Sequence, residues 1–251
     1  MERRDLLHAG ADGAVTAPAS APGPATPPHA DRQPHADRPF AVDRQFVSTR
    51  FPVVGAAQPV PPARRGWAFA TPRGDHDLNP GSPLPERLTP AAVLVPLVER
   101  PQGFTILLTQ RTAHLHDHAG QISFPGGRVD PCDTDPESCA LREAAEEVGL
   151  DRDVVDLIGR LDHYVTGTGF EVVPVVGFVR PPFDIRPDPF EVAEVFEVPL
   201  SFVLDPANHR REKHVRRGEE RHFYVLPFET RYIWGATAGM LVNLAEVLRA
   251  P

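Results

Sequence analysis

Apolar and polar positions divide the chain from Leu88 onward into short strands and two longer helices. Two apolar runs, AAVLVPLVER (91–100) and GFTILLTQRT (103–112), predict buried strands joined by a turn at 101–103. GQISFPGGRV predicts a third strand, VVDLIGRLDHYVT and FEVVPVVGFVR predict more, and RHFYVLPFETRYIWG predicts a hairpin. Because strands and helices are mixed without regular βαβ alternation, we expect an α/β sandwich with a mixed sheet.

Two stretches have the spacing of amphipathic helices. In the first, Asp135 is the expected N-cap, Pro136 takes the first helical position and Gly149 marks the C-terminal end. Its expected apolar stripe consists of Ala140, Leu141, Ala144, Ala145 and Val148. The second stretch is ATAGMLVNLAEVLR, near the C-terminus, with Met240, Leu241, Leu244, Val247 and Leu248 at helical spacing. We therefore predict one helix in the middle of the chain and one at its end.

The first 90 residues differ in composition, since they hold 16 of the 30 prolines. Residues 1–40, rich in Pro and Ala, bury too little apolar surface to offset chain entropy, so we predict that they are disordered. Residues 41–87 are predicted to be a transitional, extended segment, and residues 88–251 the folded domain. Three aromatic residues are expected to pack on the domain surface: Phe46, Phe51 and Trp67.

Composition and charge narrow the function classes. A net charge of -8 argues against general nucleic-acid binding. The two cysteines, Cys132 and Cys139, form no disulfide framework, so a reducing compartment is expected. The N-terminus lacks the apolar region of a secretory signal, and the apolar run at 91–98 is too short to span a bilayer. We predict a cytoplasmic protein without nucleic-acid or membrane partners.

The candidate chemistry lies in FPGGRVDPCDTDPESCALREAAEEVGL (124–150). Its Gly-Gly turn allows the backbone to approach a ligand closely. The helix that follows carries three carboxylates on one side: Glu143, Glu146 and Glu147. Such a cluster is either a solvated acidic face or a site for a hard cation such as Mg²⁺, which binds oxygen ligands and bridges to phosphates. The flanking glycines favour the cation site, and Arg142 is expected to pair with Glu146 or with the loop carboxylates.

This stretch resembles the Nudix box. The family pattern is Gly, five residues, Glu, seven residues, Arg-Glu, an apolar residue, any residue, Glu-Glu, any residue, Gly and an apolar residue. The matching positions are Gly127, Arg142-Glu143, Ala144 and 146–150. The loop departs from the pattern, because Asp133 stands in place of the first Glu and one extra residue precedes Arg142.

The resemblance implies a Nudix-fold α/β/α sandwich around a mixed sheet. It also implies a cofactor, Mg²⁺ or Mn²⁺, held by Glu143, Glu146, Glu147 and Gly127. The implied catalytic residues are Glu147, Glu146 and Arg142, with one of the two glutamates as the general base. Outside the box, Glu194 is a further candidate base, with Glu191 three residues before it.

A second stretch, LLTQRTAHLHDHAGQISFPGG (107–127), resembles the signature of coenzyme A pyrophosphatases within the Nudix family. Most of its defined positions match, with Thr112 in place of Ser or Ala and His116 in place of a second Arg. His114 or His118 is expected to share phosphate contacts with His116. The implied substrate contacts are Arg111, Thr109, His116, Gly120, Phe124 and Gly126.

The two resemblances together cover about 88–250 and imply an enzyme. Its reaction would be hydrolysis of the pyrophosphate bond of coenzyme A or acyl-coenzyme A, giving 3′,5′-ADP and 4′-phosphopantetheine or its acylated form. One alternative is a Nudix hydrolase for another nucleoside diphosphate derivative, such as ADP-ribose or NADH. A second alternative is a Nudix-fold binding module without catalysis. The resemblance also allows a homodimer, and the sequence leaves the oligomeric state open.

Overall fold

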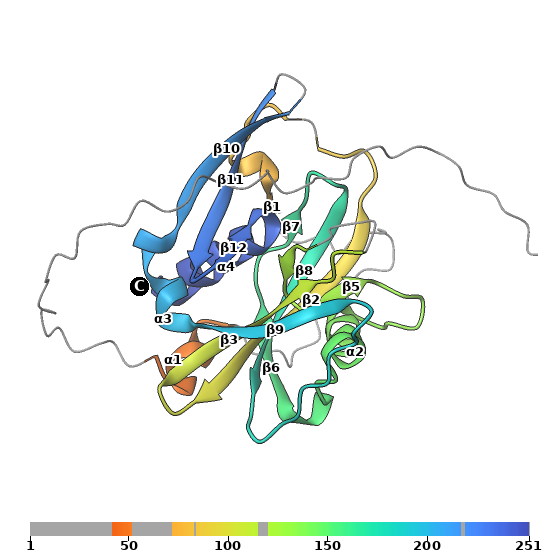
Figure 1. Ribbon diagram of the computed structural model, residues 1–251, viewed down its shortest axis with the longest axis vertical. Coiled ribbons are helices and arrows are strands. Elements are labelled where there is room, and N and C mark those ends of the chain that lie inside the picture. Colours follow the sequence, from red (N-terminus) through yellow and green to blue (C-terminus); the bar gives the residue numbers. More distant parts are fainter. Residues whose placement is uncertain (1–41, 52–71, 83, 115–119, 217–218, 251) are drawn as a thin grey trace, which may run out of the picture.

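The computed structural model describes residues 42–51, 72–82, 84–114, 120–216 and 219–250. Its centre is a nine-stranded sheet with the order β1-β7-β8-β2-β3-β4, in which β5 also pairs with β2, β6 with β8 and β9 with β3 (Figure 1). The strands are β1 (Arg73–Gly74), β2 (Thr89–Arg100), β3 (Gly103–Arg111), β4 (Ile122–Ser123), β5 (Gly126–Arg128), β6 (Val155–Arg160), β7 (Tyr164–Val165), β8 (Phe170–Val179) and β9 (Val192–Pro199). The sheet is mixed, because β2 runs parallel to β8 and antiparallel to β3.

Helices cover both faces of this sheet. They are α1 (Arg44–Thr49), α2 (Pro136–Val148), α3 (Leu200–Leu204) and α4 (Gly235–Arg249), with short 3₁₀ turns η1 (Asp75–Asp77), η2 (Arg152–Val154) and η3 (Pro206–Asn208). A second sheet is formed by β10 (Arg210–Arg216), β11 (Glu219–Phe228) and β12 (Arg231–Trp234), and it includes the predicted hairpin (Figure 1). None of the helices in the described ranges is long and apolar enough to cross a membrane.

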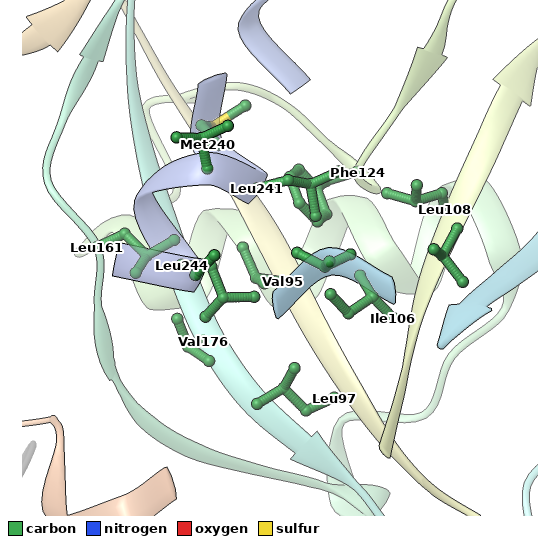
Figure 2. Packing of buried hydrophobic residues seen from close by; sticks show 14 of the residues in the cluster. Val95, Leu97, Ile106, Leu108, Phe124, Leu161, Val176, Met240, Leu241 and Leu244 are labelled. Carbon is green, nitrogen blue, oxygen red and sulfur yellow. The ribbon is translucent and has the colours of Figure 1, made fainter. Parts of the chain in front are cut away.

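Two hydrophobic cores lie on opposite faces of the main sheet. Successive side chains of a strand point to opposite faces. Accordingly, Leu94 and Leu107 pack in the cluster that contains α2, whereas Val95 and Leu108 pack with Leu241 of α4 in the other cluster (Figure 2). The predicted α/β/α sandwich with a mixed sheet is therefore confirmed.

Helix α2 begins and ends where the sequence predicts. The Asp135 carboxylate accepts a hydrogen bond from Ser138 N at 2.7 Å, and Gly149 ends the helix in the left-handed conformation with φ 68°. The expected stripe was partly wrong, because Ala145 is exposed, whereas Cys139 and Glu147 are buried. The helix is therefore rotated so that one acidic side chain faces the protein interior.

Two further expectations about the fold need correction. The predicted third strand is broken into β4, which pairs with β3, and β5, which pairs with β2, because Pro125 and the buried Phe124 separate them. Phe51 is not on the surface but only 4% exposed, in the same core as α4. Phe46 is half-buried against that core, while Trp67 and residues 1–40 lie outside the described residues. The domain boundaries remain predictions.

Candidate active site

The glycine pair Gly126–Gly127, at the start of β5, lies close to its neighbours. A Cβ atom on Gly126 would be 2.5 Å from the Ala92 carbonyl oxygen, on neighbouring β2. A Cβ atom on Gly127 would be 2.5 Å from the carboxylate carbon of Glu143. The Gly127 carbonyl oxygen lies 3.8 Å from Cys139 Sγ, which donates to it. Close packing against the backbone of β2 therefore requires glycine at 126, while a side chain at 127 would displace the Glu143 carboxylate, so the glycine pair lies directly against the acidic side of α2.

Glu147 is the buried acid of the site, with only 5% of its surface exposed. Its Oε2 accepts a hydrogen bond from Gly126 N at 3.2 Å, and its Oε1 lies 3.6 Å from Arg111 Nη1. Burial raises the pKa of Glu147 to about 7, although the Gly126 N–H and Arg111 act in the opposite direction. The neighbouring carboxylates of Glu143 and Glu191 raise this pKa further.

Arg142 connects the loop to the helix. Its Nε and Nη2 donate to the two oxygens of Asp133 at 3.0 and 2.8 Å, and its Nη1 donates to Glu143 at 2.9 Å and Glu146 at 3.1 Å. This pairing holds the pKa of Asp133 below its usual range. The expected pairing of Arg142 with Glu146 and with a loop carboxylate is confirmed. The shorter acid in the longer loop still reaches the guanidinium with both oxygens.

The three box glutamates do not converge. Glu143 and Glu147 both lie against the glycine pair Gly126–Gly127, whereas the Glu146 side chain is 62% exposed and paired with Arg142. In the described part of the chain, no three His, Cys, Asp or Glu side chains come together closely enough to hold a metal ion. The metal ligand set of Glu143, Glu146, Glu147 and Gly127 remains a prediction. Two of the glutamates lie against the glycine pair, and burial raises the pKa of both.

Arg111 ends β3 beside this acidic pair. Its Nη1 lies 3.9 Å from Glu191 Oε2, too far for a hydrogen bond, and its buried Nε has no hydrogen-bond partner among the described residues. A half-buried guanidinium whose Nε donor has no described partner is suited to an anionic ligand. The structure thus brings the predicted phosphate contact and the predicted catalytic acid together.

Glu191, not Glu194, is the acid outside the box that joins the site. Glu194 forms an ion pair with Arg231 of β12 and a hydrogen bond to the same side chain. Glu191 lies next to Arg111 and is close enough to Glu147 to raise its pKa. The two glutamates are three residues apart, so the sequence flagged both as a pair. Their contacts differ because Glu191 lies in the turn before β9, whereas Glu194 lies within β9.

The remaining expected substrate contacts are less uniform. Thr109 and Phe124 are each 1% exposed, and the Thr109 hydroxyl bonds to Ser123. Their side chains face the interior of the protein. Contact of these two residues with a substrate remains a prediction. Gly120 is exposed with φ 70°, a conformation that favours glycine. His116 and His118 lie outside the described residues.

The raised pKa of Glu147 gives the metal-free protein a contribution to stability at acid pH that is lost at neutral pH. Folding shifts this pKa from 4.5 to about 7, so Glu147 binds more protons in the native state between these values, and its contribution to stability falls as pH rises. From about pH 4 to about pH 8 the loss is about 3 kcal/mol, at about 1.4 kcal/mol per tenfold change in proton affinity. We expect urea unfolding in EDTA to show that the free energy of unfolding of Glu147→Gln, relative to the wild type, rises by this amount between about pH 4 and about pH 8. A difference that does not change with pH would contradict the buried, neutral acid.

Comparison with known proteins agrees with this geometry. The family model of the NUDIX domain matches residues 88–218, more than half of the chain. The chain therefore belongs to the Nudix family, and it is a Nudix hydrolase, as the sequence predicted. This class hydrolyses pyrophosphate bonds in nucleoside diphosphate derivatives.

Relatives of known name support the assignment. Two proteins of Escherichia coli, from strains O6:H1 and K12, are each named "Uncharacterized Nudix hydrolase NudL". They are 44% and 43% identical to this chain over 155 residues, which is 62% of this chain and 80% of each relative.

Among solved structures, a C. elegans Ap4A hydrolase is 22% identical with a TM-score of 0.39, covering 44% of this chain and 80% of its own. The NUDIX domain of Shewanella oneidensis NrtR, complexed with ADP ribose, is 24% identical with a TM-score of 0.36, covering 51% and 83%.

Proposed function

We propose that this Nudix hydrolase cleaves the pyrophosphate bond of coenzyme A or acyl-coenzyme A. The products would be 3′,5′-ADP and 4′-phosphopantetheine or its acylated form. The observation that carries the proposal is the position of Arg111, a residue of the coenzyme A signature, with its buried Nε free of described partners and its Nη1 3.6 Å from Glu147. A substrate phosphate oxygen would satisfy this guanidinium.

The residues present fit a hard divalent cation, Mg²⁺ or Mn²⁺. Glu143 and Glu147 offer carboxylate oxygens beside the same pair of glycines, and oxygen ligands of this kind suit such an ion. We propose that these two hold the ion, with Glu146 and the Gly127 backbone as further oxygen donors. When bound, the ion would neutralise diphosphate charge and acidify a water molecule.

The chain's own residues have separate tasks in this proposal. Arg142 orients Glu143 and anchors the loop through Asp133, while Gly126 N–H orients Glu147. Water attacks one phosphorus, the bond from that phosphorus to the bridging oxygen breaks, and a carboxylate accepts the proton of the water. Glu147 is the preferred base, in which case it would serve as base rather than as a ligand of the ion, with its Oε2 oriented by the Gly126 N–H. Glu146 is the alternative.

A hydrolysis assay tests the substrate. The full chain would be incubated with coenzyme A, acetyl-coenzyme A, ADP-ribose and NADH, with Mg²⁺ or with EDTA, and the products separated by chromatography. We expect metal-dependent release of 3′,5′-ADP, with the highest kcat/KM for the two coenzyme A substrates. Turnover of ADP-ribose or NADH without turnover of coenzyme A would overturn the proposed substrate but not the assignment as a Nudix hydrolase. No turnover of any substrate would favour the binding module.

A further inference from the structure

An exposed aromatic pair, Phe190 and His114, lies beside the candidate active site. Phe190 is 64% exposed, and its ring centroid is 5.0 Å from that of His114 at an interplanar angle of 62°. A single exposed apolar side chain is ordinary on a protein surface. The backbone N–H and carbonyl of Phe190, however, are both hydrogen-bonded to side chains.

Phe190 is fixed to the end of β3. Its N–H donates to the Asp188 side chain at 2.8 Å, and its carbonyl accepts a hydrogen bond from the buried Thr112 hydroxyl at 2.8 Å. Thr112 N also donates to the Glu191 carbonyl at 2.9 Å. Thr112 directly follows Arg111, so the aromatic ring and the Arg111 guanidinium are carried by segments that are hydrogen-bonded together.

The same turn is also fixed to the catalytic helix. Asp188 N donates to the Glu147 carbonyl at 2.9 Å, and Arg186 N donates to the Val148 carbonyl at 2.8 Å. Figure 1 shows the segment before β9 passing alongside α2. Pro187 and Pro189 limit the freedom of this backbone. The turn therefore presents the Phe190 ring at a set position relative to Glu147 and Arg111.

We propose that Phe190, with His114 at its edge, is the stacking platform for the adenine base of the substrate. This inference rests on the proposed function, whose substrate carries a diphosphate joined to adenosine. A base has a flat π face for the ring and polar edges that suit the exposed polar groups of His114, Asp188 and Glu191. An acyl chain would instead need apolar walls, whereas the side chains bonded to or stacked on Phe190 are the polar Asp188, Thr112 and His114.

The platform predicts a loss of affinity without a loss of chemistry. Removing a stacked aromatic ring should weaken binding by about tenfold. Phe190→Ala should therefore raise KM for coenzyme A by about tenfold and change kcat by less than about twofold, while Phe190→Trp keeps KM low. Tyr232→Ala is the matched control, because Tyr232 is an exposed aromatic residue on the separate three-stranded sheet and should leave KM unchanged.

Calorimetry with product halves identifies what lies on the ring. Phe190→Ala should weaken binding of 3′,5′-ADP by about tenfold and leave binding of 4′-phosphopantetheine unchanged. Equal affinity of wild type and variant for 3′,5′-ADP, or a loss confined to 4′-phosphopantetheine, would overturn the platform. Because this measurement needs no turnover, a chain that binds 3′,5′-ADP through Phe190 but does not cleave coenzyme A would remove the proposed function and keep the platform.

Thr112 tests whether the position of the ring matters. Thr112→Val removes the hydroxyl that bonds the Phe190 carbonyl, and it should raise KM for coenzyme A by about threefold with kcat retained. Thr112→Ser keeps the hydroxyl and should restore the lower KM. An equal KM for the valine and serine variants would show that this hydrogen bond does not position the platform.

Discussion

Glu147→Gln should lower kcat by at least about 100-fold without unfolding the protein, the size expected for losing an acid-base or charge-stabilising group. The glutamine has nearly the same shape, so its oxygen can still accept the Gly126 N–H. It cannot accept a proton or bind a cation as a carboxylate does. The measurement is kcat at saturating coenzyme A and Mg²⁺, with circular dichroism to check the fold.

Glu146→Gln is the matched comparison for this result. Glu146 lies next to Glu147 in sequence, but its side chain is 62% exposed and bound to Arg142. We expect its loss to be smaller, about tenfold. A Glu147→Gln enzyme that stays fully active and metal-dependent would contradict the role of Glu147. A larger loss in Glu146→Gln than in Glu147→Gln would transfer the role of base to Glu146.

Arg142→Ala should lower the free energy of unfolding by about 2 kcal/mol, because it leaves a buried carboxylate without its charged partner. The Asp133 side chain is only 3% exposed, and both of its oxygens accept hydrogen bonds from Arg142. The substitution leaves this carboxylate uncompensated and returns Glu143 and Glu146 to mutual repulsion. Urea unfolding measures the change.

Arg180→Ala is the control for Arg142→Ala. Arg180 pairs with Asp156, but its side chain is 51% exposed, so its loss should cost less than about 0.5 kcal/mol. Asp133→Asn in the Arg142→Ala background should recover part of the lost stability, because it removes the uncompensated charge. A loss below about 1 kcal/mol in Arg142→Ala, or no recovery in the double variant, would show that this ion pair does not hold the loop.

Features that depend on neighbours in sequence were predictable. Helix α2 follows from Asp135, Pro136 and Gly149, because capping and left-handed termination are decided within one helical turn. The strands β2 and β3 follow from continuous apolar runs, which are typical of strands covered on both faces. The reaction class follows for the same reason, since the Nudix box is one loop and one helix.

Features that join distant segments required the tertiary structure. The sequence placed Glu143, Glu146 and Glu147 on one side of a helix. The packing of α2 against the glycines of β5 decides that Glu147 is buried and Glu146 is not. Likewise, Glu191 reaches Arg111 because the pairing of β9 with β3 shifts register at Gln110 and Arg111.

The chain's own sequence therefore determined the elements, the reaction class and the residues available for it. The tertiary structure decided which of them meet. Thr109 and Phe124 were reasonable substrate contacts by sequence, yet their side chains face the core, because alternate strand positions and the break between β4 and β5 turn them inward. Phe190 carried no motif and became a candidate only because its carbonyl accepts a hydrogen bond from Thr112 and Asp188, in the same turn, donates to the Glu147 carbonyl. Burial and long-range contacts depend on how strands pair across the sheet, and no short stretch of sequence encodes that pairing.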